Sequence, residues 1–299
     1  MPLNPPPSDH PSTLPGGTLY LVATPIGNLE DITLRALRVL GSVDLIAAED
    51  TRHTGQLLSH FNISTPLISF HEHNETGRSV QLIEKMKNGA SIALVSDAGT
   101  PLVSDPGYKL ISLAVEKGVQ IVPIPGVSAA ITALIASGLP TDTFVFIGFT
   151  ARKKNRQREQ IAELKNDKRT LIFYESPRRV IPLLETLREI LGERDVVLAR
   201  ELTKVYEEFV RGRLSVVIES LSQRSQVKGE CTLVVSGTEP APPDMALVRE
   251  EIRKRLEDDN VSPSFLSREL SEKYSFRKRI VYEEILRIKS EISEHDGEP

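Results

Sequence analysis

The segment TLYLVATPIGN, residues 18–28, indicates the class of fold because an apolar run changes abruptly into a turn. Residues 18–23 are mostly aliphatic, which is typical of a strand buried on both faces. Residues 24–28 then bring proline and glycine, which end a strand and begin a loop. Similar apolar runs follow at 43–48, 67–70, 90–96, 119–124 and 143–149, with longer amphipathic segments between them. This alternation predicts an α/β fold whose mostly parallel sheet is covered by helices.

A second group of strands is expected at 170–174, 195–201, 208–211 and 230–237. The spacing between these runs is shorter, and two of them are joined only by a loop, which indicates a mixed sheet with antiparallel neighbours. We therefore predict two lobes, an N-terminal α/β lobe over residues 18–125 and a C-terminal α/β lobe over residues 126–238, with the break near Pro125.

The two ends of the chain differ from these lobes. Residues 1–17 carry six prolines and few apolar side chains, which predicts a disordered leader. Residues 239–299 begin with a proline-rich linker and continue with apolar residues at helical spacing, such as Val281, Ile285, Ile288 and Ile292. They predict a small helical module. From Ala241 onward the chain has 14 acidic and 11 basic residues, a balance that suits packing on the body or on a partner as well as binding RNA.

Composition limits the classes of protein that need to be considered. The 299 residues are 39% hydrophobic and 26% charged, with a net charge of −4 at pH 7. No apolar run approaches the roughly 18 residues needed to cross a bilayer, and the first lysine or arginine is Arg35, so no secretory signal is expected. We expect a soluble, cytoplasmic protein with no membrane partner. The single cysteine, Cys231, excludes an intrachain disulfide and a cysteine-based metal site, and His71 and His73 lack further ligands nearby, so no metal is expected.

Four loops that follow predicted strands are rich in glycine, proline or hydroxyl residues: 24–28, 96–101, 125–129 and 175–177. Ligands bind at this edge of open α/β sheets; any one loop could be an ordinary turn, but four together favour a site. The sequence contains neither G-x-G-x-x-G after a strand nor a G-x-x-x-x-G-K-[ST] phosphate loop. Small apolar walls, the Asp97 carboxylate and the hydroxyls of Thr100 and Ser128 suit a ligand with an adenosine, a carboxylate and a positive sulfonium. Ser128 could instead simply cap the helix that follows it.

These residues also carry a family resemblance. The segments LVATPIGNLED at 21–31, AEDTR at 48–52 and SDAGTP at 96–101 resemble the ribosomal RNA small subunit methyltransferase I family, and residues 123–129, 173–179 and 230–235 extend the likeness over roughly 18–237. The resemblance implies a two-lobed tetrapyrrole-methylase-like fold and S-adenosylmethionine as cofactor, bound in a cleft between the lobes. It further implies a homodimer that 2'-O-methylates a cytidine ribose in 16S ribosomal RNA, as free RNA or in the 30S particle.

The resemblance assigns roles to individual residues. It implies that the following residues bind the cofactor: Pro25, Gly27, Asn28, Asp97, Ala98, Gly99, Thr100, Pro101, Ser128 and Ala129. Because a ribose hydroxyl is a poor nucleophile, a nearby carboxylate or neutral histidine would help by accepting its proton. Glu49, Asp50 and Arg52 are the catalytic candidates, with His53 a weaker one. Structural roles remain open for them, since Asp50 could cap a helix and Arg52 could pair with Glu49.

Two basic segments are candidate RNA contacts. One patch gathers five basic side chains directly after a predicted strand: Arg152, Lys153, Lys154, Arg156 and Arg158. The other is Arg178 and Arg179, at the expected start of a helix, where a cation opposes the helix dipole unless an anion such as phosphate compensates. The patch could equally be a solvated helix face, and the two arginines could pair with Glu175 or Glu201.

Two other functions remain open on the sequence alone. A methyltransferase of the same superfamily that acts on a tetrapyrrole or on a protein side chain would not need the basic patch. A non-catalytic RNA-binding assembly factor could retain the same fold, although it would have no need for Asp97, Thr100 and Ser128 together.

Overall fold

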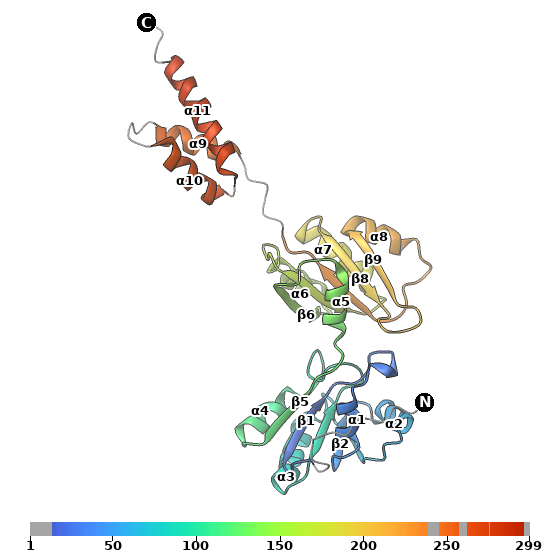
Figure 1. Cartoon of the computed structure of the whole chain (residues 1–299). Coiled ribbons are helices and arrows are strands. Elements are labelled where there is room, and N and C mark those ends of the chain that lie inside the picture. The colour runs from blue at the N-terminus through green and yellow to red at the C-terminus, as the bar shows by residue number, and fades with distance from the viewer. Residues whose placement is uncertain (1–13, 239–244, 257–261, 275, 296–299) are drawn as a thin grey trace. The chain divides into compact units, whose positions relative to one another are not determined.

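The computed structural model describes residues 14–238, 245–256, 262–274 and 276–295 (Figure 1). Residues 1–13 of the expected leader and residues 239–244 of the expected linker lie outside this part of the chain. The chain divides into two compact units, and the division falls after Thr238.

The first sheet of the larger unit is parallel, with strand order β3-β2-β4-β1-β5. Its strands are β1 (Thr18–Val22), β2 (Leu45–Ala48), β3 (Leu67–Ser69), β4 (Ile92–Val95) and β5 (Gln120–Ile124). The helices between them are α1 (Leu34–Leu40), α2 (Thr51–His60), α3 (Glu75–Lys87) and α4 (Tyr108–Glu116). The parallel order confirms the α/β pattern expected from the alternating sequence.

Alternate residues of β1 pack against different helices, as the two-residue period of a strand requires. Tyr20 and Val22 belong to the core cluster that contains α1 residues such as Val39. Leu19 belongs to the cluster on the other face, with Met86 of α3 and residues of α4. Helices therefore cover both faces of the sheet, and the ends of its strands remain available for a ligand site.

The second sheet is mixed, with strand order β6-β7-β10-β8-β9. Its strands are β6 (Phe144–Phe149), β7 (Thr170–Glu175), β8 (Asp195–Arg200), β9 (Glu208–Arg213) and β10 (Cys231–Val235). Only the β6–β7 pair is parallel, and β10 runs antiparallel to both β7 and β8. The antiparallel neighbours expected from the short spacing of these runs are confirmed.

Helices cover both faces of the second sheet. α5 (Ala129–Ser137) packs Ala133 and Leu134 against β7, β8 and β10 on one face. The other face is covered by α6 (Lys154–Ala162), α7 (Val180–Leu191) and α8 (Leu214–Ser222). Leu183 and Leu184 of α7 lie in the core cluster that these three helices share. The first turn of α5 lies close to the end of β7, where the backbone N–H of Ala130 meets the Tyr174 hydroxyl.

The second compact unit contains α9 (Met245–Leu256), α10 (Pro263–Tyr274) and α11 (Lys278–His295), which confirms the expected helical module. Leu266 and Leu270 of α10 are buried against Val281, Ile285 and Ile288 of α11. Ile292 falls on the same helical face by its spacing but is 37% exposed, since it lies one turn beyond this buried cluster. No helix in the described parts of the chain has the length and apolar character that a membrane span needs.

Candidate functional site

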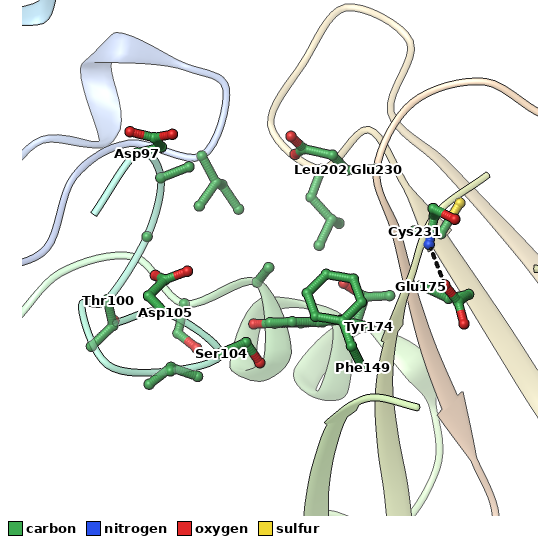
Figure 2. A pocket seen from close by; sticks show the side chains of 18 of the residues that line it. Asp97, Thr100, Ser104, Asp105, Phe149, Tyr174, Glu175, Leu202, Glu230 and Cys231 are labelled. Carbon is green, nitrogen blue, oxygen red and sulfur yellow. Dashed lines mark hydrogen bonds between the residues drawn. The ribbon is translucent and has the colours of Figure 1, made fainter. Parts of the chain in front are cut away.

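A cavity of about 430 Å³ lies where loops of the first sheet face loops of the second (Figure 2). Cavities of this size hold nucleoside-sized ligands. The first sheet contributes Ile26, Glu49, 97–100 and 103–105 to its walls. The remaining walls are Ser128, Ala129, Phe149, 174–177, Leu202 and 230–232. Segments far apart in the sequence therefore meet here.

Hydrogen bonds tie the loops of the first sheet together beneath this cavity. Thr24 and Gly99 form an isolated antiparallel bridge, with both N–H···O distances at 2.9 Å. The Thr100 hydroxyl donates to the carbonyl of Val127 at 2.9 Å, which joins the 96–101 loop to the loop before α5. Gly99 has a φ of +81°, and a Cβ there would lie 3.3 Å from Cγ2 of Ile26. Three of the four loops expected at one sheet edge are thus held as one surface.

Three carboxylates gather on this surface without a basic neighbour. An Asp97 oxygen accepts the backbone N–H of Asp50 at 2.9 Å, while Glu49 and Asp105 line the same cavity. Burial raises the pKa of Glu49, and the nearby charges of Asp105 and Asp97 raise it further. Burial also raises the pKa of Asp105, against a hydrogen bond from Ser96.

The lining of this cavity includes no lysine or arginine. In the described part of the chain, no group of three or more histidine, cysteine, aspartate or glutamate side chains is arranged to hold a metal ion. An uncompensated acidic wall favours a positively charged organic ligand and disfavours a phosphate. This agrees with the ligand class expected from the sequence.

Asp50 and Arg52 lie beside the cavity rather than in it. Asp50 is the N-cap of α2, and its carboxylate accepts the backbone N–H of Arg52 at 2.8 Å. The same carboxylate forms an ion pair with the Arg52 guanidinium, also at 2.8 Å, and this hydrogen bonding holds the pKa of Asp50 well below its usual range. Arg52 pairs with Asp50 and not with Glu49, and its side chain is 88% exposed. His53 is exposed on α2 as well.

The turn at residues 25–28 joins the first sheet to the loop after β8. Ile26 lines the cavity and Pro25 is buried, whereas Gly27 and Asn28 are exposed. The backbone N–H of Asn28 donates to Oγ1 of Thr203 at 3.0 Å, and the Asn28 side chain caps the short helix η1 (Leu29–Asp31). The turn residues expected to bind the cofactor, Pro25, Gly27 and Asn28, do not line the cavity; Ile26 does, and the turn itself contacts the loop at Thr203.

Replacing Gly27 by Ala is expected to lower the midpoint of thermal unfolding and to weaken ligand binding in the cavity. A Cβ at Gly27 would lie 2.9 Å from Oγ1 of Thr203 and 3.1 Å from the Leu202 carbonyl, and it would also meet the Lys204 side chain. Overpacking of this kind costs about 1–3 kcal/mol of the free energy of unfolding. Gly77→Ala in α3 is the control, because nothing lies within 4 Å of its Cβ position and alanine favours a helix. Equal midpoints for the two variants would contradict the contact.

The first turn of α5 is held by Tyr174. Ser128 occupies the N-cap position but forms no capping hydrogen bond through its side chain. Instead, the backbone N–H of Ala130 donates to the Tyr174 hydroxyl at 3.1 Å. Burial raises the pKa of Tyr174, opposed by its hydrogen bonds with Ala130 and with the Ser128 side chain. Ser128 and Ala129 thus face the cavity from a helix end that β7 positions.

A second cavity of about 540 Å³ contains two of the expected RNA contacts, Arg152 and Arg179. Arg179 forms an ion pair with the buried Glu175 at 3.2 Å and also donates to the carbonyls of Thr150 and Ala151. The pairing of Arg179 with Glu175, one of the alternatives that the sequence left open, is the arrangement observed.

The remaining basic residues behave differently from one another. The Arg158 guanidinium forms two hydrogen bonds with the Glu189 carboxylate, at 2.5 and 2.6 Å. Lys153 is the N-cap of α6, Lys154 opens that helix, and both are exposed. Arg156 and Arg178 are exposed too. The patch is therefore divided between one paired side chain and several that face solvent.

Several lining residues were not singled out by their sequence pattern. The segment Ser104-Asp105-Pro106-Gly107 has the composition of a turn, and Leu102 and Ser104 each adopt a φ of +71°, a strained conformation that is frequent at functional sites. That composition was the one available signal for Asp105. Leu202 and Thr232 carry no such signal, because only the sheet packing places them at the cavity. Cys231 also lines it, but burial raises the pKa of its thiol to about 12, so it is not a nucleophile near neutral pH.

Comparison with solved structures supports this fold. A uroporphyrin-III-C-methyltransferase from Thermus thermophilus is 23% identical, with a TM-score of 0.53 over 74% of this chain and 94% of that one. The cobalt precorrin-4 methyltransferase CbiF is 16% identical, with a TM-score of 0.56 over 74% of this chain and 95% of that one. At these identities the likeness concerns the fold alone.

Sequence comparison is more specific. The family model described as Tetrapyrrole (Corrin/Porphyrin) Methylases matches residues 18–217. A protein of Halalkalibacterium halodurans named ribosomal RNA small subunit methyltransferase I is 55% identical over 221 residues, 74% of this chain and 76% of that protein. A protein of Synechocystis sp. with the same name is 48% identical over 280 residues, 92% of this chain and 99% of that protein. The chain therefore belongs to the ribosomal RNA small subunit methyltransferase I family, within the tetrapyrrole methylases.

Proposed function

We propose that this protein transfers the methyl group of S-adenosylmethionine to the ribose 2'-hydroxyl of a cytidine in small-subunit ribosomal RNA. The observation that carries the proposal is an acidic cavity, free of basic side chains, in a chain about half identical to proteins named for methylating this RNA. A structural relative from Thermus thermophilus, 19% identical, is described as complexed with S-adenosylhomocysteine, the product of such a transfer.

The residues of the cavity suit the methyl donor. When bound, S-adenosylmethionine supplies a methyl group on a positively charged sulfur. Asp97, Glu49 and Asp105 provide negative charge that attracts this cation, and none of them forms an ion pair within residues 14–238. Ala98 and Gly99 present no bulky side chain, so a ligand can approach the backbone closely.

Glu49 is the proposed proton acceptor for the ribose hydroxyl. It follows β2 directly, lines the cavity, and has a raised pKa, which makes its carboxylate a stronger base than an exposed glutamate. Asp50 and Arg52, which pair with each other outside the cavity, are proposed to fix the start of α2 and thereby the position of Glu49. Asp50 also donates its backbone N–H to Asp97, so this segment positions two of the three carboxylates.

Charge reversal of Lys153 and Lys154 together is expected to weaken binding of small-subunit RNA about tenfold or more at moderate salt. Both side chains are exposed at the start of α6, where they are available to phosphates, and affinity for S-adenosylmethionine should not change. The salt dependence of binding should also flatten, by about one unit of log–log slope for each phosphate that the variant no longer neutralises. Filter binding across a salt series measures both effects.

The matched control reverses Lys85 and Lys87, two exposed lysines in the last turn of α3. This change alters the net charge by the same amount away from α6. Equal decreases in RNA affinity in the two double variants would show that net charge, and not the patch, sets the affinity.

A cytoplasmic homodimer is part of the same proposal. α5 leaves Ile131 and Ile135 exposed, at 45% and 72%, and a second copy of the chain would cover this apolar face. Light scattering is expected to give twice the chain mass of 33.2 kDa, and a mass of one chain at micromolar concentration would reject the dimer.

Mass mapping of ribose methylation in small-subunit RNA tests the function directly. RNA from cells lacking this protein should lack one cytidine ribose methyl group, which the wild-type gene restores and Asp97→Ala does not. Transfer of labelled methyl groups to porphyrin precursors but not to small-subunit particles would identify a tetrapyrrole, and not RNA, as the substrate. Calorimetry that detects no binding of S-adenosylmethionine would favour a non-catalytic assembly factor.

A further inference from the structure

The second cavity adjoins the first and shares three residues with it. Phe149, Glu175 and Ser176 line both cavities, and the second is completed by Thr150, Arg152 and Arg179. The first cavity has an acidic wall, whereas the second has two arginines. A ligand that spans both would therefore meet opposite charge at its two ends.

Phe149 is held at the junction by an irregularity in β6. The pairing of β6 with β7 shifts between Phe146 and Gly148, so that Phe149 pairs with Tyr174. Gly148 has a φ of +69°, and a Cβ there would lie 2.8 Å from Oγ of Ser104. A bulge of this kind changes the direction of the side chains that follow it, and bulges are frequent next to active sites.

The ring of Phe149 is supported but remains accessible. It lies edge-on to Tyr174, with ring centroids 5.7 Å apart and an angle of 63° between the planes (Figure 2). The side chain is nevertheless 56% exposed. An aromatic ring that is fixed by its neighbours and open to solvent loses little conformational entropy when a planar ligand stacks on it.

The two arginines of the second cavity have different roles. Arg179 is neutralised by Glu175 and donates to the carbonyls of Thr150 and Ala151, so it stabilises the wall. The Gln157 side chain donates to Oγ1 of Thr150 at 2.7 Å, which makes this wall a buried hydrogen-bonded network. Arg152 is exposed at the same cavity, and it is the side chain placed to contact a phosphate.

We infer that the second cavity holds the acceptor nucleotide, with its base stacked on Phe149 and an adjacent phosphate against Arg152. This inference rests on the proposed function, because it gives the RNA substrate its place beside the donor cavity. Unpaired RNA bases are commonly recognised by stacking on aromatic side chains. Since Phe149 lines both cavities, a base stacked on it places the attached ribose next to the donor cavity, whose lining includes Glu49.

Three substitutions at one position test the stacking. Phe149→Leu keeps an apolar side chain but removes the ring, and it is expected to lower kcat/KM for small-subunit particles from cells lacking this protein by about tenfold. Phe149→Tyr keeps the ring and should retain nearly full kcat/KM. Affinity for S-adenosylmethionine, measured by calorimetry, should be unchanged in both. Phe144→Leu is the matched control, because Phe144 is an exposed aromatic on the same strand that lines neither cavity.

Each alternative result has a distinct meaning. Unchanged kcat/KM in Phe149→Leu would overturn the inference while leaving the proposed function intact, provided that the wild-type protein methylates the particles. A parallel decrease in affinity for S-adenosylmethionine would instead place Phe149 against the adenine of the donor. Failure of the wild type to methylate the particles would reject the function itself.

The absence of tryptophan from the sequence permits a direct second measurement with the third substitution. Phe149→Trp introduces a single tryptophan, which can be excited selectively over the six tyrosines. Its emission should be quenched by protein-free small-subunit RNA and not by S-adenosylhomocysteine alone. Phe144→Trp should show no quenching with either. Unquenched emission at RNA concentrations that filter binding shows to be saturating would overturn the inference, as would quenching by S-adenosylhomocysteine alone.

Discussion

Replacing Glu49 by Gln is expected to lower kcat by about a hundredfold or more at saturating S-adenosylmethionine. The amide has the shape of the carboxylate but cannot accept the proton of the ribose hydroxyl. Glu49 is the candidate because it lines the cavity and because burial, Asp105 and Asp97 together raise its pKa. Steady-state transfer of labelled methyl groups to small-subunit particles measures the effect.

The same variant should change the pH dependence of the reaction. A base must be ionised, so wild-type kcat is expected to fall as pH decreases through the raised pKa of Glu49, which lies above the ordinary value of 4.5. In Glu49→Gln this acidic limb should be absent. A profile that keeps the same limb in the variant would assign it to another group.

Stability should move in the opposite direction to activity. Because the pKa of Glu49 is higher in the folded than in the unfolded protein, the folded state binds the proton more tightly. The free energy of unfolding therefore falls as pH rises from 4.5 through the raised pKa of Glu49, and this loss of stability persists at neutral pH. Removing the charge should leave the thermal midpoint unchanged or raise it, which separates lost chemistry from unfolding.

Two further variants complete this test. Glu30→Gln changes an exposed glutamate of η1 that does not line the cavity, and it should retain normal kcat. Asp105→Asn removes the other carboxylate whose pKa is raised. A large decrease in kcat in Asp105→Asn together with none in Glu49→Gln would transfer the role of proton acceptor to Asp105.

Replacing Asp97 by Asn is expected to weaken the binding of S-adenosylmethionine by about tenfold or more. The amide oxygen can still accept the backbone N–H of Asp50, so the local geometry is preserved. What the variant lacks is the negative charge that is proposed to attract the sulfonium. Calorimetry with the purified protein measures the affinity without need for RNA. Asp97→Asn should weaken the binding of donor analogues that lack the positive charge much less than it weakens the binding of S-adenosylmethionine.

Asp50→Asn is the matched control for Asp97→Asn. Asparagine also caps helices well, and the Asp50 carboxylate is paired with Arg52 outside the cavity. Its donor affinity should stay within about twofold of the wild type, since surface ion pairs contribute little. Equal decreases in the two variants would show that the general field of the acidic segment, and not contact with Asp97, attracts the donor.

The sequence was informative about the fold wherever the pattern reflects burial. The apolar run at residues 18–23 ends in Thr24-Pro25, and β1 ends at Val22, because a strand covered on both faces must be apolar and must stop where proline and glycine begin. The shorter spacing after residue 170 likewise indicated antiparallel neighbours. Helical spacing indicated the burial of Val281, Ile285 and Ile288 but not the exposure of Ile292, which depends on how far the partner helices extend.

The candidate site was only partly visible in the sequence. Asp97, Gly99 and Thr100 stood out because they follow a strand, and they do line or support the cavity. Gly27 and Asn28 stood out for the same reason, but their observed contact is with the loop at Thr203. Asp50 and Arg52 share a segment with Glu49, yet the first turn of α2 directs them into an ion pair with each other. Adjacent residues of one motif therefore differ in role, because their side chains leave the backbone in different directions.

Local pattern was enough to predict the order of strands and helices, three of the four loops at one sheet edge, and the family, since each depends on residues contiguous in the chain. The fourth loop, 175–177, follows β7 of the second sheet instead. Tertiary structure alone decided that Asp105, Phe149 and Leu202 share a cavity with Asp97. Parallel strands place their ends together whatever their separation in sequence, and the bulge before Phe149 sets the direction of its ring only through pairing with β7. Contacts of this kind arise from the folded arrangement of distant segments, which no local pattern encodes.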